Sequence, residues 1–159
     1  MEPTTVTRFF QQDHERLDGL LRQFHELKRS DSAKAVEAFK EFKFGLQRHI
    51  VWEEELLFPR WEQATGITEG PTRVMRIEHR RIGEALEMIH KKVQAGDPES
   101  DQEEQQLVAL LASHNQKEER ILYPAIDQAL DERDRSALFT EMRAIPEDRY
   151  RVCCPTNPA

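Results

Sequence analysis

The chain has 159 residues, the usual size of one domain, so we expect a single hydrophobic core. Charged residues make up 33% of the sequence and apolar residues only 38%, a mixture that suits amphipathic helices with charged outer faces. The formal net charge of −7 disfavours binding to nucleic acid or to an anionic membrane surface, and no apolar run approaches the ~18 residues of a transmembrane helix. We therefore expect no nucleic-acid partner and no membrane partner.

Breaker and capping residues divide the sequence into helices. Gly66 is placed as a C-terminal cap, Pro71 as a first helical residue and Asp131 as an N-cap. Pro59 and Pro124 lie late in two long segments, where each should bend its helix. Apolar residues recur at helical spacing in the four long segments. The predicted helices cover, in chain order, about residues 5–28, 33–64, 71–95, 97–130 and 131–144.

Long helices joined by short connections make antiparallel neighbours. The sequence therefore predicts an all-α fold over residues 1–145, an up-and-down antiparallel four-helix bundle with a short C-terminal helix. Two hairpins, residues 5–64 and 71–130, would build the bundle. Residues 146–159 would form a loose C-terminal tail.

The predicted tail holds the two cysteines of the sequence, Cys153 and Cys154. Two adjacent cysteines cannot build a framework of disulfides, and no secretory signal is visible at the N-terminus. These features predict a reducing, cytoplasmic setting. A redox or soft-metal role for the two thiols stays open.

A shift of 65 residues superimposes the first hairpin on the second, and all six histidines then pair. A chance alignment of every histidine is improbable, so the chain is interpreted as a duplicated hairpin with approximate two-fold symmetry. The matching positions are His14 with His79, His25 with His90, His49 with His114, Asp13 with Glu78, Glu53 with Glu118, Phe58 with Tyr123 and Pro59 with Pro124.

Each half carries a histidine followed four residues later by a glutamate, in His49-Ile-Val-Trp-Glu53 and His114-Asn-Gln-Lys-Glu118. This separation puts both side chains on one face of a helix, so each pair forms half of a metal site. The other two helices add one histidine each, on stripes that apolar neighbours mark as inward-facing. If both glutamates bridge two metal ions, each ion has two nitrogen ligands and keeps open coordination positions. The predicted metal ligands are His14, His49, Glu53, His79, His114 and Glu118.

Two longer strings have the form His-x-x-x-Glu-Glu-x-x-Leu-Phe/Tyr-Pro, at residues 49–59 and 114–124, and acidic-histidine pairs stand at 13–14 and 78–79. On these strings the chain resembles the hemerythrin-like, HHE cation-binding family over about residues 5–130. The resemblance implies a four-helix bundle that holds two non-haem iron ions, bridged by carboxylate and oxo or hydroxo groups. It also implies that the four histidines are terminal ligands and that the two glutamates bridge. Zinc would accept the same ligands.

The chain departs from the oxygen-carrying hemerythrins at Met75, where those proteins have a further histidine one turn before the third-helix ligand. They also carry an aspartate five residues after the last histidine, where this chain has Glu119. The departures favour the bacterial hemerythrin-like proteins that sense, detoxify or handle iron over a reversible oxygen carrier.

The sequence therefore predicts a di-iron protein that binds or reacts with dioxygen, nitric oxide or peroxide, in sensing, storage or stress defence. The alternative is a redox enzyme or an iron-handling protein, such as a ferroxidase, a peroxidase-like detoxifier or a donor of iron for cluster repair. A third hypothesis is a bundle that acts only through protein contacts.

Other residues near these strings are expected to have supporting roles. Glu54 and Glu119 point about 100° away from the predicted bridges, which favours a solvated place or a contact that supports a ligand. His25 and His90 lie ~16 Å along the axis from the predicted ligands, so they cannot join the same site and should be partly exposed. Tyr123 is expected to pack in the core.

Overall fold

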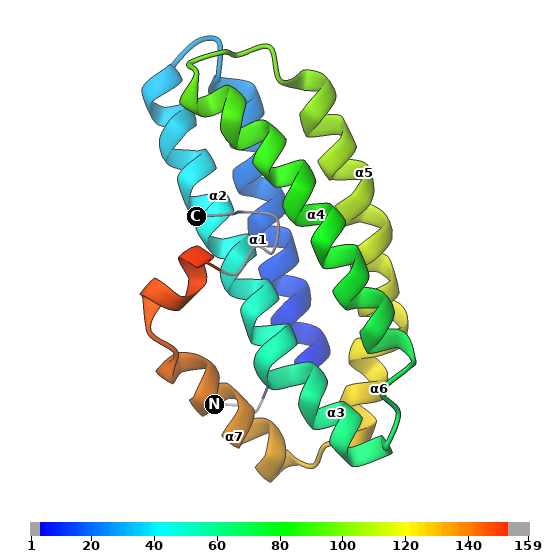
Figure 1. The fold of residues 1–159 in the computed structure, drawn as a ribbon. Helices are drawn as coiled ribbons and strands as arrows, with labels where there is room; N and C mark the ends of the chain where they lie inside the picture. The colour runs from blue at the N-terminus through cyan, green and yellow to red at the C-terminus, as the bar shows by residue number, and fades with distance from the viewer. Residues whose placement is uncertain (1–3, 153–159) are drawn as a thin grey trace.

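The computed structural model describes residues 4–152 and shows only helices and their connections among them (Figure 1). Two π-helical turns, η1 (Trp52–Leu57) and η2 (Glu118–Leu122), join α2 to α3 and α5 to α6, and a 3-10 helix, η3 (Glu147–Val152), follows α7. The predicted all-α class is confirmed. The α-helices are α1 (Val6–Leu27), α2 (Ser32–Val51), α3 (Phe58–Thr65), α4 (Pro71–Gln94), α5 (Asp101–Lys117), α6 (Tyr123–Ala129) and α7 (Glu132–Ala144).

Four long helical segments lie side by side: α1, α2 with α3, α4, and α5 with α6 (Figure 1). Helix α1 packs mainly against α2, and α4 packs mainly against α5, as expected for two hairpins. Helix α1 also contacts α6, and α2 contacts α4. The short α7 lies on the outside, against η1.

Local signals in the sequence set most helix ends. The side chains of Thr5, Asp31 and Asp131 each cap a helix by accepting a hydrogen bond from the N–H group three residues further on. Gly66, with φ 74°, adopts the left-handed conformation that ends α3, and Pro71 is the first residue of α4.

Helix α5 begins at Asp101, whereas the sequence analysis placed its start at about Asp97. The Asp97 carboxylate accepts a hydrogen bond of 2.9 Å from the N–H of Glu99, which closes a local turn in place of a helical one. The hydroxyl of Ser100 donates to Glu104 at 2.6 Å. The short polar side chains of this connection therefore delay the helix by one turn.

The core forms two apolar clusters along the long axis of the molecule. On α1, Leu17 and Leu21 belong to the first cluster, and Val6 and Phe10 belong to the second. His14 lies between these two pairs in the sequence and is buried. Polar side chains at this level of the fold are therefore held between two layers that exclude water.

The irregularity expected at the two late prolines takes the form of a π turn. The N–H of Phe58, just before Pro59, bonds to the carbonyl oxygen of Glu53, five residues back. The N–H of Tyr123 bonds to the carbonyl oxygen of Glu118 in the same way. Because a proline ring crowds the preceding turn and offers no N–H, widening that turn relieves the conflict.

The prediction of a loose tail is wrong for residues 147–152, which form η3. Tyr150 is only 3% exposed, and its hydroxyl accepts a hydrogen bond of 3.0 Å from the indole Nε1 of Trp52. The Tyr150 ring also meets Phe44 edge to face, with centroids 5.6 Å apart. One aromatic side chain therefore anchors a segment that its polar and proline content had marked as loose.

No helix among residues 4–152 is both long enough and apolar enough to cross a membrane. The two cysteines, Cys153 and Cys154, lie outside the described residues, so the question of a redox or soft-metal role stays open.

Candidate metal centre

The six predicted ligand side chains converge on one point between the two apolar clusters. None of them is more than 4% exposed, and both carboxylates are fully buried. Each side chain comes from a different element: His14 from α1, His49 from α2, Glu53 from η1, His79 from α4, His114 from α5 and Glu118 from η2.

Each of the two glutamates faces one histidine from each half of the repeat. Because each glutamate contacts histidines of both halves, neither half completes the cluster alone. The distances from imidazole Nε2 to the nearest carboxylate oxygen are 3.1 Å for His79–Glu53, 3.5 Å for His49–Glu53, 3.2 Å for His14–Glu118 and 3.3 Å for His114–Glu118.

A second carboxylate holds each histidine from behind, at the Nδ1 atom. An ionised carboxylate can only accept a hydrogen bond, so each Nδ1 donates, which leaves Nε2 as the atom that can bind a metal. The repeat preserves this arrangement in both halves. The four contacts are Asp13–His49 at 2.8 Å, Glu78–His114 at 2.9 Å, Glu54–His79 at 2.6 Å and Glu119–His14 at 2.7 Å.

The structure thus places Glu54 and Glu119 behind two of the histidines, in one of the two roles that the sequence analysis favoured. Their side chains are 28% and 26% exposed, so they connect the buried cluster with the protein surface. Asp13 and Glu78 lie one residue before a histidine of the cluster, yet each contacts a histidine of the neighbouring helix.

The charges of the cluster shift the pKa values of its members in opposite directions. Burial by itself lowers the pKa of His49, but the charge of Glu53 and the hydrogen bond to Asp13 outweigh it and raise the pKa to about 10. Burial likewise opposes the rise for His79, where hydrogen bonds to Glu53 and Glu54 raise the pKa to about 9. Burial alone raises the pKa of Glu53, but the facing histidines hold it well below the ordinary value of a glutamate. In the metal-free cluster, cationic His49 and His79 therefore face an anionic Glu53.

Tyr123 lies at the centre of the cluster, and the sequence analysis missed this. Its hydroxyl is 2.6 Å from Glu53 Oε2 and 2.8 Å from Glu118 Oε1, and 3.3 Å from His49 Nε2. Burial, and then the two nearby carboxylates, raise the pKa of this phenol well above its ordinary value. A phenol has one proton to donate, so Tyr123 satisfies one glutamate at a time. The signal available in the sequence was the single hydroxyl by which Tyr123 differs from Phe58.

The donor set fits a cation. The ligand atoms of Glu53, His79, His114 and Glu118 all lie within 4.8 Å of one another, as do those of His14, His49 and Glu118. Glu118 belongs to both groups, and its buried Oε2 accepts no well-aligned hydrogen bond, although His114 Nε2 lies 3.3 Å away. Among the ion pairs of residues 4–152, none joins either glutamate to a lysine or arginine. A buried carboxylate oxygen without a donor is costly unless a cation meets it.

Comparison with known proteins agrees with this geometry. The chain matches the family model of the hemerythrin HHE cation-binding domain over residues 5–126, which include all six converging side chains. The chain belongs to this family.

The hemerythrin HHE domain is similar to two longer proteins. It is 32% identical over 133 residues to a DNA nickase of Nostoc sp., an alignment that covers 83% of this chain and 36% of that protein. It is 31% identical over 91 residues to the iron-sulfur cluster repair protein YtfE of Edwardsiella ictaluri, covering 53% of this chain and 41% of that protein. The aligned parts thus span less than half the length of either relative. No solved structure gives a significant match.

The remaining two histidines of the HHE domain lie outside the cluster, as predicted. His25 is half exposed and contacts Glu104 at 2.8 Å. With Asp101 these residues bring their ligand atoms together, but the ammonium of Lys28 bonds to both carboxylates and supplies the cation there. His90 is partly exposed and contacts Glu87 at 3.4 Å.

Met75, the residue that stands in place of a histidine, is 3% exposed and belongs to the second apolar cluster. It lies one turn before His79 on α4. Its counterpart in the first half is Phe10, whose ring meets His49 edge to face at 5.1 Å. Both positions wall the cluster with apolar atoms.

Proposed function

We propose that this HHE domain is an up-and-down antiparallel four-helix bundle holding a non-haem di-iron centre that binds or reacts with dioxygen, nitric oxide or peroxide. One observation carries the proposal: two fully buried carboxylates each face imidazoles from both halves of the repeat. Imidazole and carboxylate ligands together suit iron in both of its common oxidation states.

In this proposal the two groups of ligand atoms hold one iron ion each. One ion would take Glu53, His79, His114 and Glu118, and the other His14, His49 and Glu118, so that both ions would share Glu118. Glu53 also lies 3.5 Å from His49 of the second group. The bound iron would supply electron transfer and coordination positions open to a small ligand.

The side chains around the ligands prepare this centre. The carboxylates behind the histidines fix each imidazole ring and raise its basicity, and the apolar clusters above and below keep water out. Tyr123 holds a proton at its hydroxyl oxygen, within hydrogen-bond distance of both glutamates. That proton is available to a carboxylate that loses its other partner.

A second candidate function is iron handling, including the supply of iron for cluster repair. The observation that favours it is the 31% identity with the iron-sulfur cluster repair protein YtfE. In that case the centre would release its iron to an acceptor instead of retaining it through repeated reactions with a small ligand. Both candidate functions are compatible with the predicted cytoplasmic setting.

Metal analysis combined with an optical spectrum tests the proposal. The protein is loaded with Fe(II) without oxygen, freed of excess metal and then exposed to air while the spectrum is recorded. We expect about two iron ions per chain and an oxidation that changes the spectrum and leaves the iron bound. Loss of iron to an added acceptor protein during the experiment would favour iron handling. A chain that retains no metal would refute both functions.

A further inference from the structure

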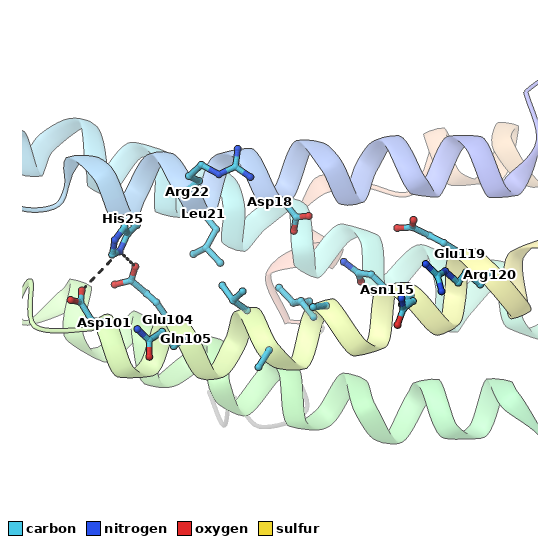
Figure 2. Close-up of a pocket in the computed structure, with 15 residues that line it drawn as sticks. Asp18, Leu21, Arg22, His25, Asp101, Glu104, Gln105, Asn115, Glu119 and Arg120 are labelled. Atoms are coloured by element: carbon cyan, nitrogen blue, oxygen red, sulfur yellow. Dashed lines mark hydrogen bonds and ion pairs between the residues drawn. The ribbon is translucent and has the colours of Figure 1, made fainter.

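A groove of about 790 Å³ runs along the molecule between α1 and α5 (Figure 2). One end lies at His25, and the other end reaches Glu119, the carboxylate that holds His14. Apolar side chains such as Leu21 and Leu111 line its floor. The groove therefore extends from the far end of the bundle to the back of the metal centre.

A second, much smaller cavity lies inside the bundle, beside the four histidines of the cluster. Its volume of about 10 Å³ is enough for roughly one water-sized molecule. Apolar side chains make up much of its wall, among them Leu17, Leu46 and Ile82. This cavity offers a small molecule a place next to the imidazole rings.

Three residues line both the groove and the inner cavity: Asp18, Leu111 and Asn115. Asp18 comes from α1 and the other two come from α5. The side chains of Asp18 and Asn115 lie on opposite sides of the groove (Figure 2). Asn115 is half-buried and Asp18 is exposed. These three side chains therefore form a wall that the groove and the inner cavity share.

The charges along the groove oppose the passage of an anion. An anion would pass the Asp18 carboxylate and then lose its water in a cavity with largely apolar walls, which is costly. A small uncharged molecule meets neither cost. Of the four carboxylates that line the groove, Asp101 and Glu104 are paired with the Lys28 ammonium and Glu119 contacts His14, so Asp18 is the carboxylate that an anion would meet at the inner cavity.

The repeat does not impose this polar lining. The position that matches Asn115 in the first half is Ile50, and the position that matches Glu104 is Phe39; both are buried. Gly83 on α4 matches Asp18. Polar side chains thus stand between α1 and α5 at positions whose matches on α4 and α2 are apolar residues or glycine.

We propose that the α1–α5 groove is the access route of small uncharged molecules, the size of dioxygen or nitric oxide, to the metal centre, with Asp18 and Asn115 as its inner gate. The use of this route by such molecules rests on the proposed function of the centre. The route itself is a property of the protein alone and can be tested without metal.

The metal-free test uses dissolved dioxygen as a paramagnetic probe in nuclear magnetic resonance. Dioxygen should increase the relaxation of the Leu111 and Ile82 methyl groups about threefold more than that of Ile126, which matches Ile82 in burial but lies in the second apolar cluster. Asn115→Ile, which installs the residue of the matching position, should reduce this excess. Gln106→Ile, an exposed change on α5 outside the groove, serves as control. Equal relaxation of all three residues in the wild type would overturn the route.

The metal-loaded test compares the binding rates of nitric oxide and azide. Asn115→Ile should slow nitric oxide binding by roughly tenfold, and Asp18→Asn should speed azide binding by about tenfold while nitric oxide binding stays the same. Glu84→Gln, an exposed change beside the matching position on α4, is the control for charge. Unchanged rates in both gate variants at full iron content would contradict the gate. A chain that holds no iron would defeat the proposed function only, because the dioxygen relaxation experiment still decides the route.

Discussion

The two halves of the repeat, residues 5–64 and 71–130, agree at the metal centre and differ around it. At the centre, each histidine and each carboxylate behind it has a counterpart 65 residues away. Around these ligands the halves differ, because Tyr123, whose hydroxyl contacts both glutamates, matches Phe58, and the buried pair of Lys28 and Glu104 matches the apolar residues at positions 93 and 39. Ligand geometry tolerates little change, whereas the packing around it can be exchanged.

The clearest difference between matching positions of the repeat lies near the connection between α1 and α2. The buried ammonium of Lys28 bonds to Glu104 and to Ser100 at the start of α5, so a charged cluster ties two distant helix ends together. At the matching positions, Ala35 and Phe39 of α2 belong to the first apolar cluster, and Val93 of α4 packs against it. The contact between α1 and α5 is thus stabilised by a buried ion pair, and the matching contact between α4 and α2 by apolar side chains.

The largest effect, on metal affinity, is expected when the two glutamates are replaced. The two glutamates differ in the number of ligand groups to which each belongs. Glu118 belongs to both groups of ligand atoms and Glu53 to one, so Glu118→Ala should weaken metal binding more than Glu53→Ala. We expect a loss of roughly a thousandfold in affinity for Glu118→Ala, about 4 kcal/mol, because facing cations lose their charge partner. Competition with a chelator measures this affinity. His90→Ala is the control and should bind metal normally; wild-type affinity in Glu118→Ala would exclude a bridging role.

The buried ion pair offers the next largest effect. Lys28→Val, which installs the residue of the matching position, should lower the free energy of unfolding by ~3 kcal/mol because it leaves the Glu104 carboxylate buried and poorly paired. The double variant Lys28→Val/Glu104→Phe reproduces the matching pair of Val93 and Phe39 and should recover most of the loss. Urea unfolding measures both. Arg29→Ala, a change in an exposed ion pair nearby, should leave stability unchanged. A double variant no better than the single one would show that the two matching contacts are not interchangeable here.

A smaller effect is expected when Tyr123→Phe makes the second half like the first. The variant removes the hydroxyl from Glu53 and Glu118, so the metal-free protein should lose ~1–2 kcal/mol of stability. Iron content should stay near that of the wild type, since no imidazole or carboxylate is lost. Phe58→Tyr is the reciprocal control, because it places a hydroxyl beside His79 in a ring stack 5.9 Å apart. Full loss of iron in Tyr123→Phe would show that the phenol itself is required to hold the metal.

The smallest effect is expected at Met75. A thioether is a poor ligand for oxidised iron, so Met75 should line the cluster without binding the metal. Met75→His adds a nitrogen one turn before His79 and should slow the oxidation of the reduced centre in air by about threefold, or ~0.6 kcal/mol. The rate of the spectral change after exposure to air measures this. An unchanged rate would mean that the residue at this position does not set the reactivity.

Most of the helix ends and all six converging side chains could be predicted from the sequence, because their signals are local. Gly66, Pro71 and the aspartate caps act within a few residues, and the spacing of His49 and Glu53 by itself puts both on one face. The histidine repeat then supplied the long-range pairing that a single motif lacks.

The features that sequence analysis missed depend on contacts between distant segments. Tyr123 reads as one more apolar residue of a helical stripe until the fold brings it to Glu53, 70 residues away. The anchoring of η3 depends on Tyr150 meeting Trp52, 98 residues away. The α1–α5 groove depends on how far two helices lie apart, which no residue pattern along either helix encodes.

The two π turns have a consequence for the ancestry of the fold. Each π turn holds one residue more than an α-helical turn, as if one residue had been inserted, and both begin beside the glutamates of matching strings. A single insertion that preceded the duplication accounts for both. A lone ancestral hairpin with this turn would carry two histidines and one glutamate of the cluster, and it would complete a dinuclear centre only by pairing with a second copy. In such an ancestor the metal would have joined two chains before gene fusion freed each half to vary on its own.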